Sequence, residues 1–219
     1  MFIYCCMFVV VASRALALDA RFDPADDHLI PVQYRFDHSY ERLLGNTLFL
    51  TRANLGRITV LPGHATEGET TMALHFSDKG SDATMLTMTR AKRNLWSSKF
   101  GQDPRFTKAP SPRVMRCDAP FPKATATRVS NAIKKAVIQT RELNNRNNLV
   151  TIDSTDVVFS IEEPEGRRSH GLLTAYAAGK NGAAMRRLTE LLQRYCETTP
   201  TQRLDLLKKI DEQAARVGN

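Results

Sequence analysis

The clearest pattern of hydrophobic and polar positions lies between residues 70 and 90. Met72, Leu74 and Phe76 alternate with smaller or more polar side chains, which gives the period of two that is typical of a strand with one buried face. Residues 78–82 have the sequence Asp-Lys-Gly-Ser-Asp, and these residue types favour a turn. The pattern therefore predicts an antiparallel hairpin made of residues 70–77 and 83–90.

Other short runs of β-branched and aromatic residues, separated by Gly, Asn and Pro, predict further strands. The predicted strands are residues 30–36, 47–51 and 57–61 before the hairpin, and residues 149–152, 157–162 and 171–177 in a later meander. Residues 38–44, between the first two of these strands, are expected to form one helical turn.

Apolar side chains spaced three and four residues apart predict three helices in the second half of the chain. The first covers residues 123–144, where a pair of Asn residues marks its end. The other two lie within residues 181–217 and are expected to form an antiparallel helical hairpin. Asn181 is the expected cap of the first of these, and Thr199 with Gln202 has the pattern of a capping box at the start of the second.

Strands and helices are grouped rather than alternating along the chain, which favours an α+β fold. We expect a mainly antiparallel β-sheet with one central helix and a C-terminal αα-hairpin packed on it. The chain has 219 residues, of which 42% are hydrophobic, and this suits one domain with a sizeable core. The expected domain is residues 18–219, with a β-rich region at 30–90, an irregular basic loop at 91–122, a helix at 123–144, a β-meander at 149–177 and helices at 181–217.

Residues 1–17 have the pattern of a secretory signal peptide. An unbroken apolar run covers residues 2–12, and Ala15-Leu16-Ala17 follows it as a small-x-small triplet of the kind that precedes cleavage. No Lys or Arg precedes the run, so the positive charge ahead of it is that of the amino terminus alone. A buried N-terminal strand and an uncleaved anchor are the alternatives. We expect cleavage after Ala17 and export to the periplasm or out of the cell.

Removal of this segment would change the number of cysteines. Cys5 and Cys6 would be lost, and Cys117 and Cys196 would remain. In an oxidising compartment the two remaining cysteines are expected to form a disulfide bond. Two separate buried thiols are the alternative.

The most informative local feature is a basic and aromatic segment between Arg90 and Arg116. It contains eight Lys or Arg residues and the single acidic residue Asp103, with aromatic residues interleaved. Cations beside aromatic rings suit an anionic polymer, because charge attracts the polymer and flat rings stack on its bases or sugars. Alternatively, the rings enter the core while the cations stay solvated or pair with acidic residues near the N-terminus. The candidate binding residues are Arg90, Lys92, Arg93, Trp96, Lys99 and Arg105.

The net charge of +8 at pH 7 agrees with attraction to anions, although net charge says nothing about the fold. The expected partner is an anionic polymer, a membrane surface or another protein. In an exported protein the polyanions within reach belong to the cell envelope, so we do not expect nucleic acid as the ligand.

An enzymatic alternative depends on His64, Glu67, Glu69 and His75. Two imidazoles and two carboxylates could hold the metal of a hydrolase if the chain brings them together, but their spacing matches no established signature. The chain also lacks the phosphate-binding loop, the nucleophile elbow, the dinucleotide fingerprint and the Cys-x-x-Cys motif. We therefore expect no cofactor and a non-catalytic binding domain, with an interaction subunit such as a periplasmic inhibitor as a third hypothesis.

Overall fold

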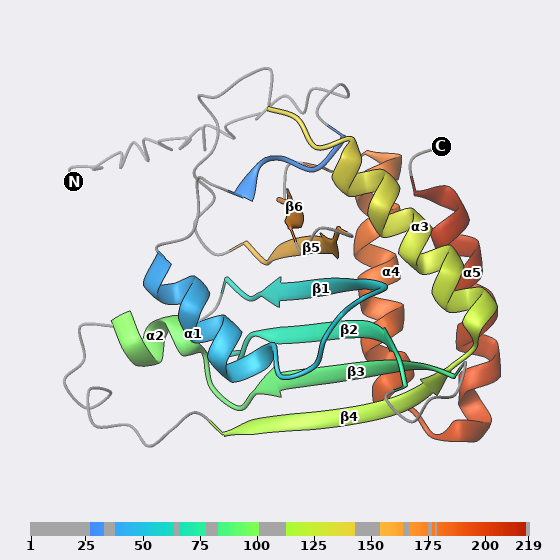
Figure 1. The fold of residues 1–219 in the computed structure, drawn as a ribbon, viewed down its shortest axis with the longest axis horizontal. Coiled ribbons are helices and arrows are strands. Elements are labelled where there is room, and N and C mark those ends of the chain that lie inside the picture. Colours follow the sequence, from blue (N-terminus) through green and yellow to red (C-terminus); the bar gives the residue numbers. More distant parts are fainter. Residues whose placement is uncertain are drawn as a thin grey trace, which may run out of the picture.

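The computed structural model is an α+β fold built on one six-stranded antiparallel sheet with the strand order β4-β3-β2-β1-β5-β6 (Figure 1). The structure describes residues 27–32, 38–63, 66–77, 83–100, 113–142, 154–163, 167–174, 177 and 179–217. The strands are β1 (Gly56–Leu61), β2 (Thr70–Phe76), β3 (Thr84–Ala91), β4 (Val114–Phe121), β5 (Asp156–Glu162) and β6 (Arg168–Leu173).

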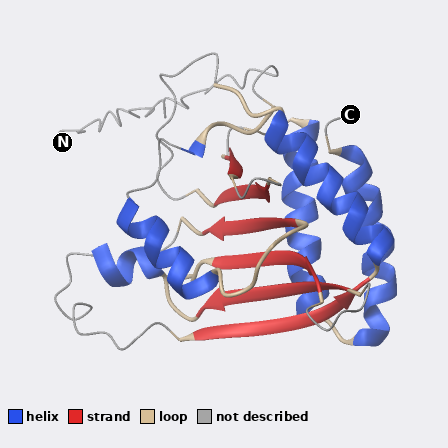
Figure 2. Ribbon diagram, viewed as in Figure 1, coloured by secondary structure: helices blue, strands red, loops and turns tan. Residues whose placement is uncertain are grey.

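In the view of Figure 2 the helices form two groups, one on either side of the strands. The C-terminal helix α5 contacts both the central helix α3 and the helix α4, and α3 and α4 pack on the sheet, which confirms the expected fold class. In Figure 1 these three helices lie on the right, and α1 and α2 lie on the left. Their bounds are α1 (His38–Leu48), α2 (Leu95–Phe100), α3 (Lys123–Ile138), α4 (Lys180–Glu197) and α5 (Arg203–Arg216), with a short 3-10 helix (Pro200–Gln202) before α5.

The predicted hairpin is confirmed. Strands β2 and β3 pair from Thr70 opposite Arg90 to Phe76 opposite Thr84, without a bulge in the register. The predicted turn at residues 78–82 lies outside the described residues.

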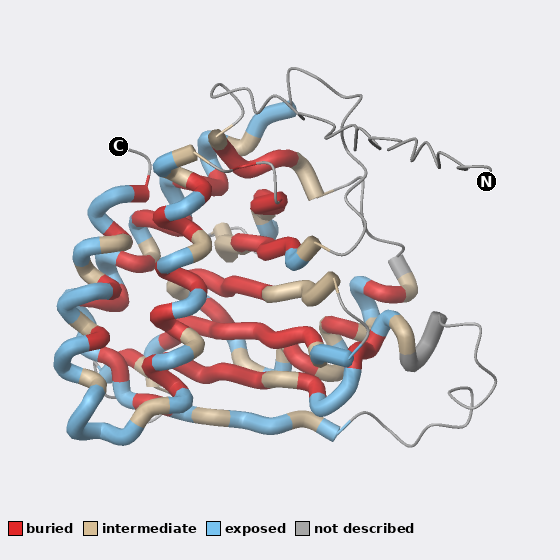
Figure 3. Tube along the Cα trace, turned by 180° about the vertical axis from the view of Figure 1, so that it is seen from behind, coloured by how far each residue is buried: buried red, intermediate tan, exposed pale blue. Residues whose placement is uncertain are grey.

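One face of the sheet forms the main core with α3, α4 and α5. Met72 and Leu74 of β2 are buried in the same hydrophobic cluster as Ile133 of α3 and Leu188 of α4. Successive side chains of a strand point to opposite faces, so His75 lies on the other face of the sheet. Figure 3 shows that the inner strands are largely buried while the edge strand β4 is mostly exposed.

At one end of the opposite face, α1 packs over the ends of the strands. Tyr40, Leu44 and Leu48, spaced four residues apart, form a second hydrophobic cluster with Ala91 and Leu95. Residues at this spacing lie on one side of a helix, and this side is the one that α1 buries.

The helical turn predicted at residues 38–44 is confirmed and is part of a longer helix. The strand predicted at residues 47–51 is wrong, because α1 continues to Leu48. The local preference of Thr, Leu and Phe for strands is outweighed by the apolar side of the longer helix. Of the strand predicted at 30–36, Ile30 makes a bridge to Leu172, and residues 33–37 lie outside the described part of the chain.

The prediction of an irregular segment at 91–122 is also wrong, since it contains α2 and the whole of β4. Along β4, Ala119 and Phe121 are buried while Asp118 and Pro120 are exposed, which is the alternation of a strand. The prolines concealed this pattern, but a strand at the edge of a sheet tolerates Pro because one side of its backbone is unpaired. Residues 101–112 lie outside the described residues.

Helix α3 ends at Ile138 rather than at residue 144. The backbone N–H of Arg141 donates to the carbonyl oxygen of Leu29 at 3.1 Å, so the chain leaves the helix to pair with a distant segment. Of the predicted meander, β5 is confirmed and β6 begins and ends a few residues earlier than expected, at Arg168–Leu173. The strand predicted at 149–152 lies outside the described residues.

Two capping predictions are corrected. The start of α4 is capped by Asp27, whose carboxylate oxygens each accept one backbone N–H, from Asn181 and from Gly182, at 2.7 Å. The side chain of Asn181 instead donates to the Asp27 carbonyl at 3.2 Å. At the start of the last helical segment the Thr199 side chain makes no capping bond to the backbone and lies 3.1 Å from the Gln202 side chain.

Candidate binding surface beside α2

The carboxylate of Glu69 is the most completely buried charged group among the described residues, with 0% of the residue exposed. The backbone N–H groups of Leu95 and Trp96 donate to its two oxygens at 2.7 and 3.1 Å. The hydroxyl group of Tyr40 donates to it at 2.8 Å. Glu69 therefore ties the end of β2 to the first turn of α2 and to α1, and a buried carboxylate with three donors is well satisfied.

Tyr40 supports the same turn with its ring. Its ring centroid lies 5.0 Å from that of Trp96, and the two planes meet at 83°, which is the favourable edge-to-face arrangement. Burial and the negative charge of Glu69 raise the pKa of the Tyr40 hydroxyl far above its ordinary value. Tyr40 therefore stays protonated and remains a hydrogen-bond donor to Glu69 at physiological pH.

The chain approaches α2 through a close backbone contact. A Cβ atom on Gly68 would lie 1.8 Å from the carbonyl oxygen of Ala91, so only glycine fits at this position. The Ala91 N–H donates to the Glu69 carbonyl at 2.9 Å. The side chain of Asn94 accepts the N–H of Ser97 at 2.8 Å, which caps α2 from its own sequence.

The result of these contacts is a fixed but exposed Trp96, with 44% of the residue accessible to solvent. Lys92 and Arg93 are exposed in the short turn that precedes α2. Arg113 is exposed beside them, since its carbonyl oxygen accepts the N–H of Lys92 at 2.9 Å. We call Lys92, Arg93, Trp96 and Arg113 the Trp96 corner. Within the described part of the chain, none of its three cations has an ion-pair partner.

The other predicted binding residues are placed differently. Arg90 faces α4, where it forms an ion pair of 2.8 Å with Glu197 and donates through Nε to Thr70 at 3.0 Å. Its charge is therefore compensated within the fold. Lys99 belongs to α2, but its side chain, like the whole of Arg105, lies outside what the structure describes. Their role in binding stays a prediction.

The residues of the enzymatic alternative are not gathered by the sheet. Glu69 directly precedes β2 and His75 lies near the far end of that strand, so the two are about 20 Å apart at the usual rise of an extended strand. Glu67 is exposed, and His64 lies outside the described residues. Among the residues that the structure describes, no group of three or more His, Cys, Asp or Glu side chains could hold a metal ion.

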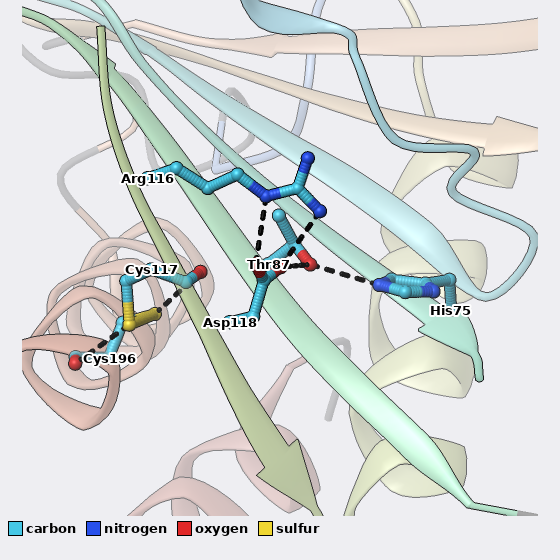
Figure 4. A network of polar contacts seen from close by, with 6 residues as sticks. All are labelled: His75, Thr87, Arg116, Cys117, Asp118 and Cys196. Carbon is cyan, nitrogen blue, oxygen red and sulfur yellow. Dashed lines mark hydrogen bonds and ion pairs between the residues drawn. A yellow bond between two sulfur atoms is a disulfide. The ribbon is translucent and has the colours of Figure 1, made fainter. Parts of the chain in front are cut away.

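His75 belongs instead to a polar network across β2, β3 and β4 (Figure 4). Its Nε2 lies 3.0 Å from the Thr87 hydroxyl, which donates to Asp118 at 2.5 Å. Arg116 donates to both oxygens of Asp118 at 2.9 and 3.0 Å, and its hydrogen bonds lower the pKa of that carboxyl. The Thr87 residue at the centre is only 1% exposed, so we interpret the network as a tie between strands.

Two more polar residues lie on this face of the sheet. Arg57 is 7% exposed, donates to the Thr51 carbonyl at 2.6 Å and lies 4.3 Å from the centre of the Phe49 ring. Burial, followed by the charge of Arg168, lowers its pKa to about 10. His170 lies 3.0 Å from the Ser160 hydroxyl. Its pKa is lowered by burial and by Arg168, against an opposing effect of Glu41.

Cys117 and Cys196 form the disulfide bond that the sequence analysis predicts (Figure 4). Their Cα atoms are 6.0 Å apart, a usual separation for a disulfide. The bond joins the edge strand β4 to the last turn of α4.

Sequence reasoning missed the support of the Trp96 corner. In the sequence, Glu69 stands out only as a member of the predicted metal or catalytic cluster, and no pattern indicates a role for Tyr40. The pattern of Tyr40, Leu44 and Leu48 could have revealed α1, but no local signal places the Tyr40 hydroxyl beside a carboxylate in another element.

None of the helices in the described part of the chain combines the length and the apolar character needed to cross a bilayer. In comparisons with known proteins, no family model matches the chain, and no curated protein or solved structure is significantly similar to it.

Proposed function

We propose that this protein is an exported, non-catalytic binding domain that contacts a phosphate-bearing surface of the cell envelope through the Trp96 corner. The observation that carries the proposal is an exposed Trp96 whose backbone is fixed by the buried Glu69. An aromatic side chain that is held in place and still exposed is preorganised for contact, which reduces the entropy lost on binding. Trp96 differs in this way from a surface aromatic residue that the core has failed to cover, because the hydrogen bonds of Glu69 hold the backbone of Trp96 in place.

The charge around Trp96 supports an anionic partner. Lys92 and Arg93 are exposed just before Trp96 in the chain, and Arg113 is exposed on the backbone that pairs with Lys92. Carboxylates of the described residues neutralise none of these three cations. Trp and Lys or Arg together suit the boundary between lipid headgroups and acyl chains, where the ring is partly buried and the cations meet phosphate. The overall charge of +8 would add long-range attraction to such a surface.

The experiment uses Trp96 as its own reporter, since it is the only Trp in the chain. Intrinsic fluorescence is recorded while the protein is titrated with vesicles of phosphatidylglycerol and phosphatidylcholine, with vesicles of phosphatidylcholine alone, and with soluble polyphosphate. We expect a blue shift with the anionic vesicles that weakens as salt is added. A response to polyphosphate alone would assign the site to a soluble or wall-bound polymer instead of a bilayer.

Two double variants distinguish the contribution of the Trp96 corner to binding from that of the net charge of the protein. Lys92→Gln with Arg93→Gln should weaken binding roughly thirtyfold, since each cation near an anionic surface contributes about 1 kcal/mol. Lys134→Gln with Lys135→Gln removes the same charge from an exposed part of α3 and should bind like the unmodified protein. Equal weakening in both variants would show that only net charge matters, and unchanged binding in the first would reject the corner. A protein partner would then be the remaining form of the binding hypothesis.

Export is tested separately, by the intact mass of the protein recovered from its native host. The expected mass corresponds to a chain that begins at Leu18 and has lost two hydrogen atoms through oxidation of Cys117 and Cys196. A full-length reduced mass would contradict export without affecting the fluorescence experiment.

A further inference from the structure

A cavity of about 580 Å³ lies between the beginning of α4 and the end of α5. Its volume is within the range of roughly 300–1,000 Å³ that is usual for small-molecule sites. The lining residues are Lys180, Ala183, Ala184, Arg187, Gln213 and Arg216.

The cavity exists because small side chains meet where two helices run side by side. Ala183 and Ala184 occupy the first turn of α4, close to the last turn of α5. Further along the two helices, the larger side chains of Leu188 and Ile210 belong to the hydrophobic core. Alanine is too short to fill the same space, so the helices leave a hollow with an apolar floor.

All of the charged residues that line the cavity are basic. Lys180, Arg187 and Arg216 are exposed, so their charged groups can reach a bound molecule. Arg187 has an ion pair of 2.8 Å with Glu190, whereas within the described residues Lys180 and Arg216 have none. The first N–H groups of α4 are already occupied by Asp27, so the positive charge of the cavity comes from the side chains.

From this combination we infer that the cavity binds an amphiphilic anion, such as a medium-chain fatty carboxylate. The apolar body of the ligand lies on Ala183 and Ala184, and its anionic group pairs with Lys180 and Arg216. A small hydrated anion gains nothing from the apolar floor, and a neutral amphiphile gains nothing from the charge of the three cations. A cationic amphiphile is repelled by them. This site goes beyond the proposed function, because it shares no residue with the Trp96 corner.

Isothermal titration calorimetry with sodium decanoate, below its micelle concentration, tests the inference. Inorganic phosphate serves as an anion without an apolar body, and decyltrimethylammonium provides the same tail with the opposite charge. We expect decanoate to bind with one molecule per chain and at least about tenfold more tightly than either of the other probes. Absence of decanoate binding, or equal affinity for phosphate, would overturn the assignment.

Matched variants locate the binding site. Lys180→Gln with Arg216→Gln should weaken decanoate binding about tenfold or more, since charge-assisted hydrogen bonds are lost. Ala183→Leu should weaken it similarly by filling the cavity, and it should fold normally because Ala183 is exposed and Leu favours helices. Lys208→Gln with Lys209→Gln removes the same charge from α5 outside the cavity and should change nothing. Unchanged binding in either cavity variant, with folding verified by circular dichroism, would refute the site.

The two proposed sites can fail independently. Lys92→Gln with Arg93→Gln should bind decanoate normally, and Ala183→Leu should bind anionic vesicles normally. A cavity variant that loses vesicle binding, with decanoate binding intact, would contradict both assignments.

Discussion

The hydroxyl group of Tyr40 donates a 2.8 Å hydrogen bond to the carboxylate of Glu69, across 29 positions of sequence and between two different elements. Both groups are buried, and the same carboxylate holds the first turn of α2. The position of an exposed tryptophan therefore depends on two residues that solvent scarcely reaches.

Replacement of Glu69 tests this dependence. Glu69→Ala should lower the free energy of unfolding by about 3 kcal/mol, because it leaves the Tyr40 hydroxyl and two backbone N–H groups without an acceptor. Chemical denaturation monitored by circular dichroism measures the loss, and the fluorescence of Trp96 should change in the native state. Glu67→Ala, at an exposed position two residues earlier, is the control and should alter stability little. Equal stability of the two variants would contradict the role of Glu69.

Reduction of the Cys117–Cys196 bond should destabilise the protein. The bond joins residues separated by 79 positions, and the chain-entropy model gives a loss of about 4 kcal/mol for a loop of this length. Denaturation with and without a reducing agent measures the difference. The variant with Cys117→Ser and Cys196→Ser should be insensitive to the reductant and should match the reduced form. A reductant effect that persists in this variant would point to another cause.

His170 should make the protein less stable as the solution becomes mildly acidic. Its pKa in the folded state lies below the ordinary value of 6.5, because burial disfavours the imidazolium and Arg168 repels it. The unfolded chain therefore binds the proton first, so this contribution is complete above pH 6.5 and is lost as the pH falls toward the folded-state pKa. His170→Asn should reduce the slope of stability against pH in the range just below 6.5. An unchanged slope would contradict the prediction.

At lower pH, the contact between α3 and α5 should weaken. Arg128 donates to both oxygens of Asp211 at 2.9 and 2.7 Å, and these bonds lower the pKa of Asp211 below its ordinary value of 3.8. A depressed carboxyl pKa stabilises the fold above the unfolded pKa, and the contribution disappears as the pH falls through the folded pKa. Asp211→Asn should therefore lower the melting temperature slightly at pH 7 and have little effect at pH 2. A difference that is as large at pH 2 as at pH 7 would contradict this assignment.

The fold class could be predicted because the strongest patterns are local. In the alternation of Met72, Leu74 and Phe76, the first two are buried in the core, while Phe76 at the end of β2 is exposed. The helices at the end of the chain show apolar sides without interruption. The disulfide could be anticipated because two cysteines remain if residues 1–17 are cleaved as the predicted signal peptide.

The remaining features depend on contacts that sequence patterns do not show. The length of α1 does not follow from local preference, because Thr47 and Phe49 at its end favour a strand, whereas packing of Leu44 and Leu48 favours the helix. The cations of the basic segment are equivalent in sequence, but Arg90 is neutralised by Glu197, whereas no carboxylate of the described residues neutralises Lys92 or Arg93. Arg90 differs from Lys92 and Arg93 only because β3 packs against α4, whereas the turn before α2 is exposed.

The cap of α4 by Asp27 has a consequence for the order of folding. The acceptor and the N–H of Asn181 are 154 positions apart, so this helix start can be completed only after nearly the whole chain has been synthesised. Contacts of such long range slow folding, because a large loop must close before they form. A shortened chain that begins after Ile30 would lose both this acceptor and the bridge to Leu172. The first turn of α4 would then fray, because its backbone N–H groups would have no capping acceptor.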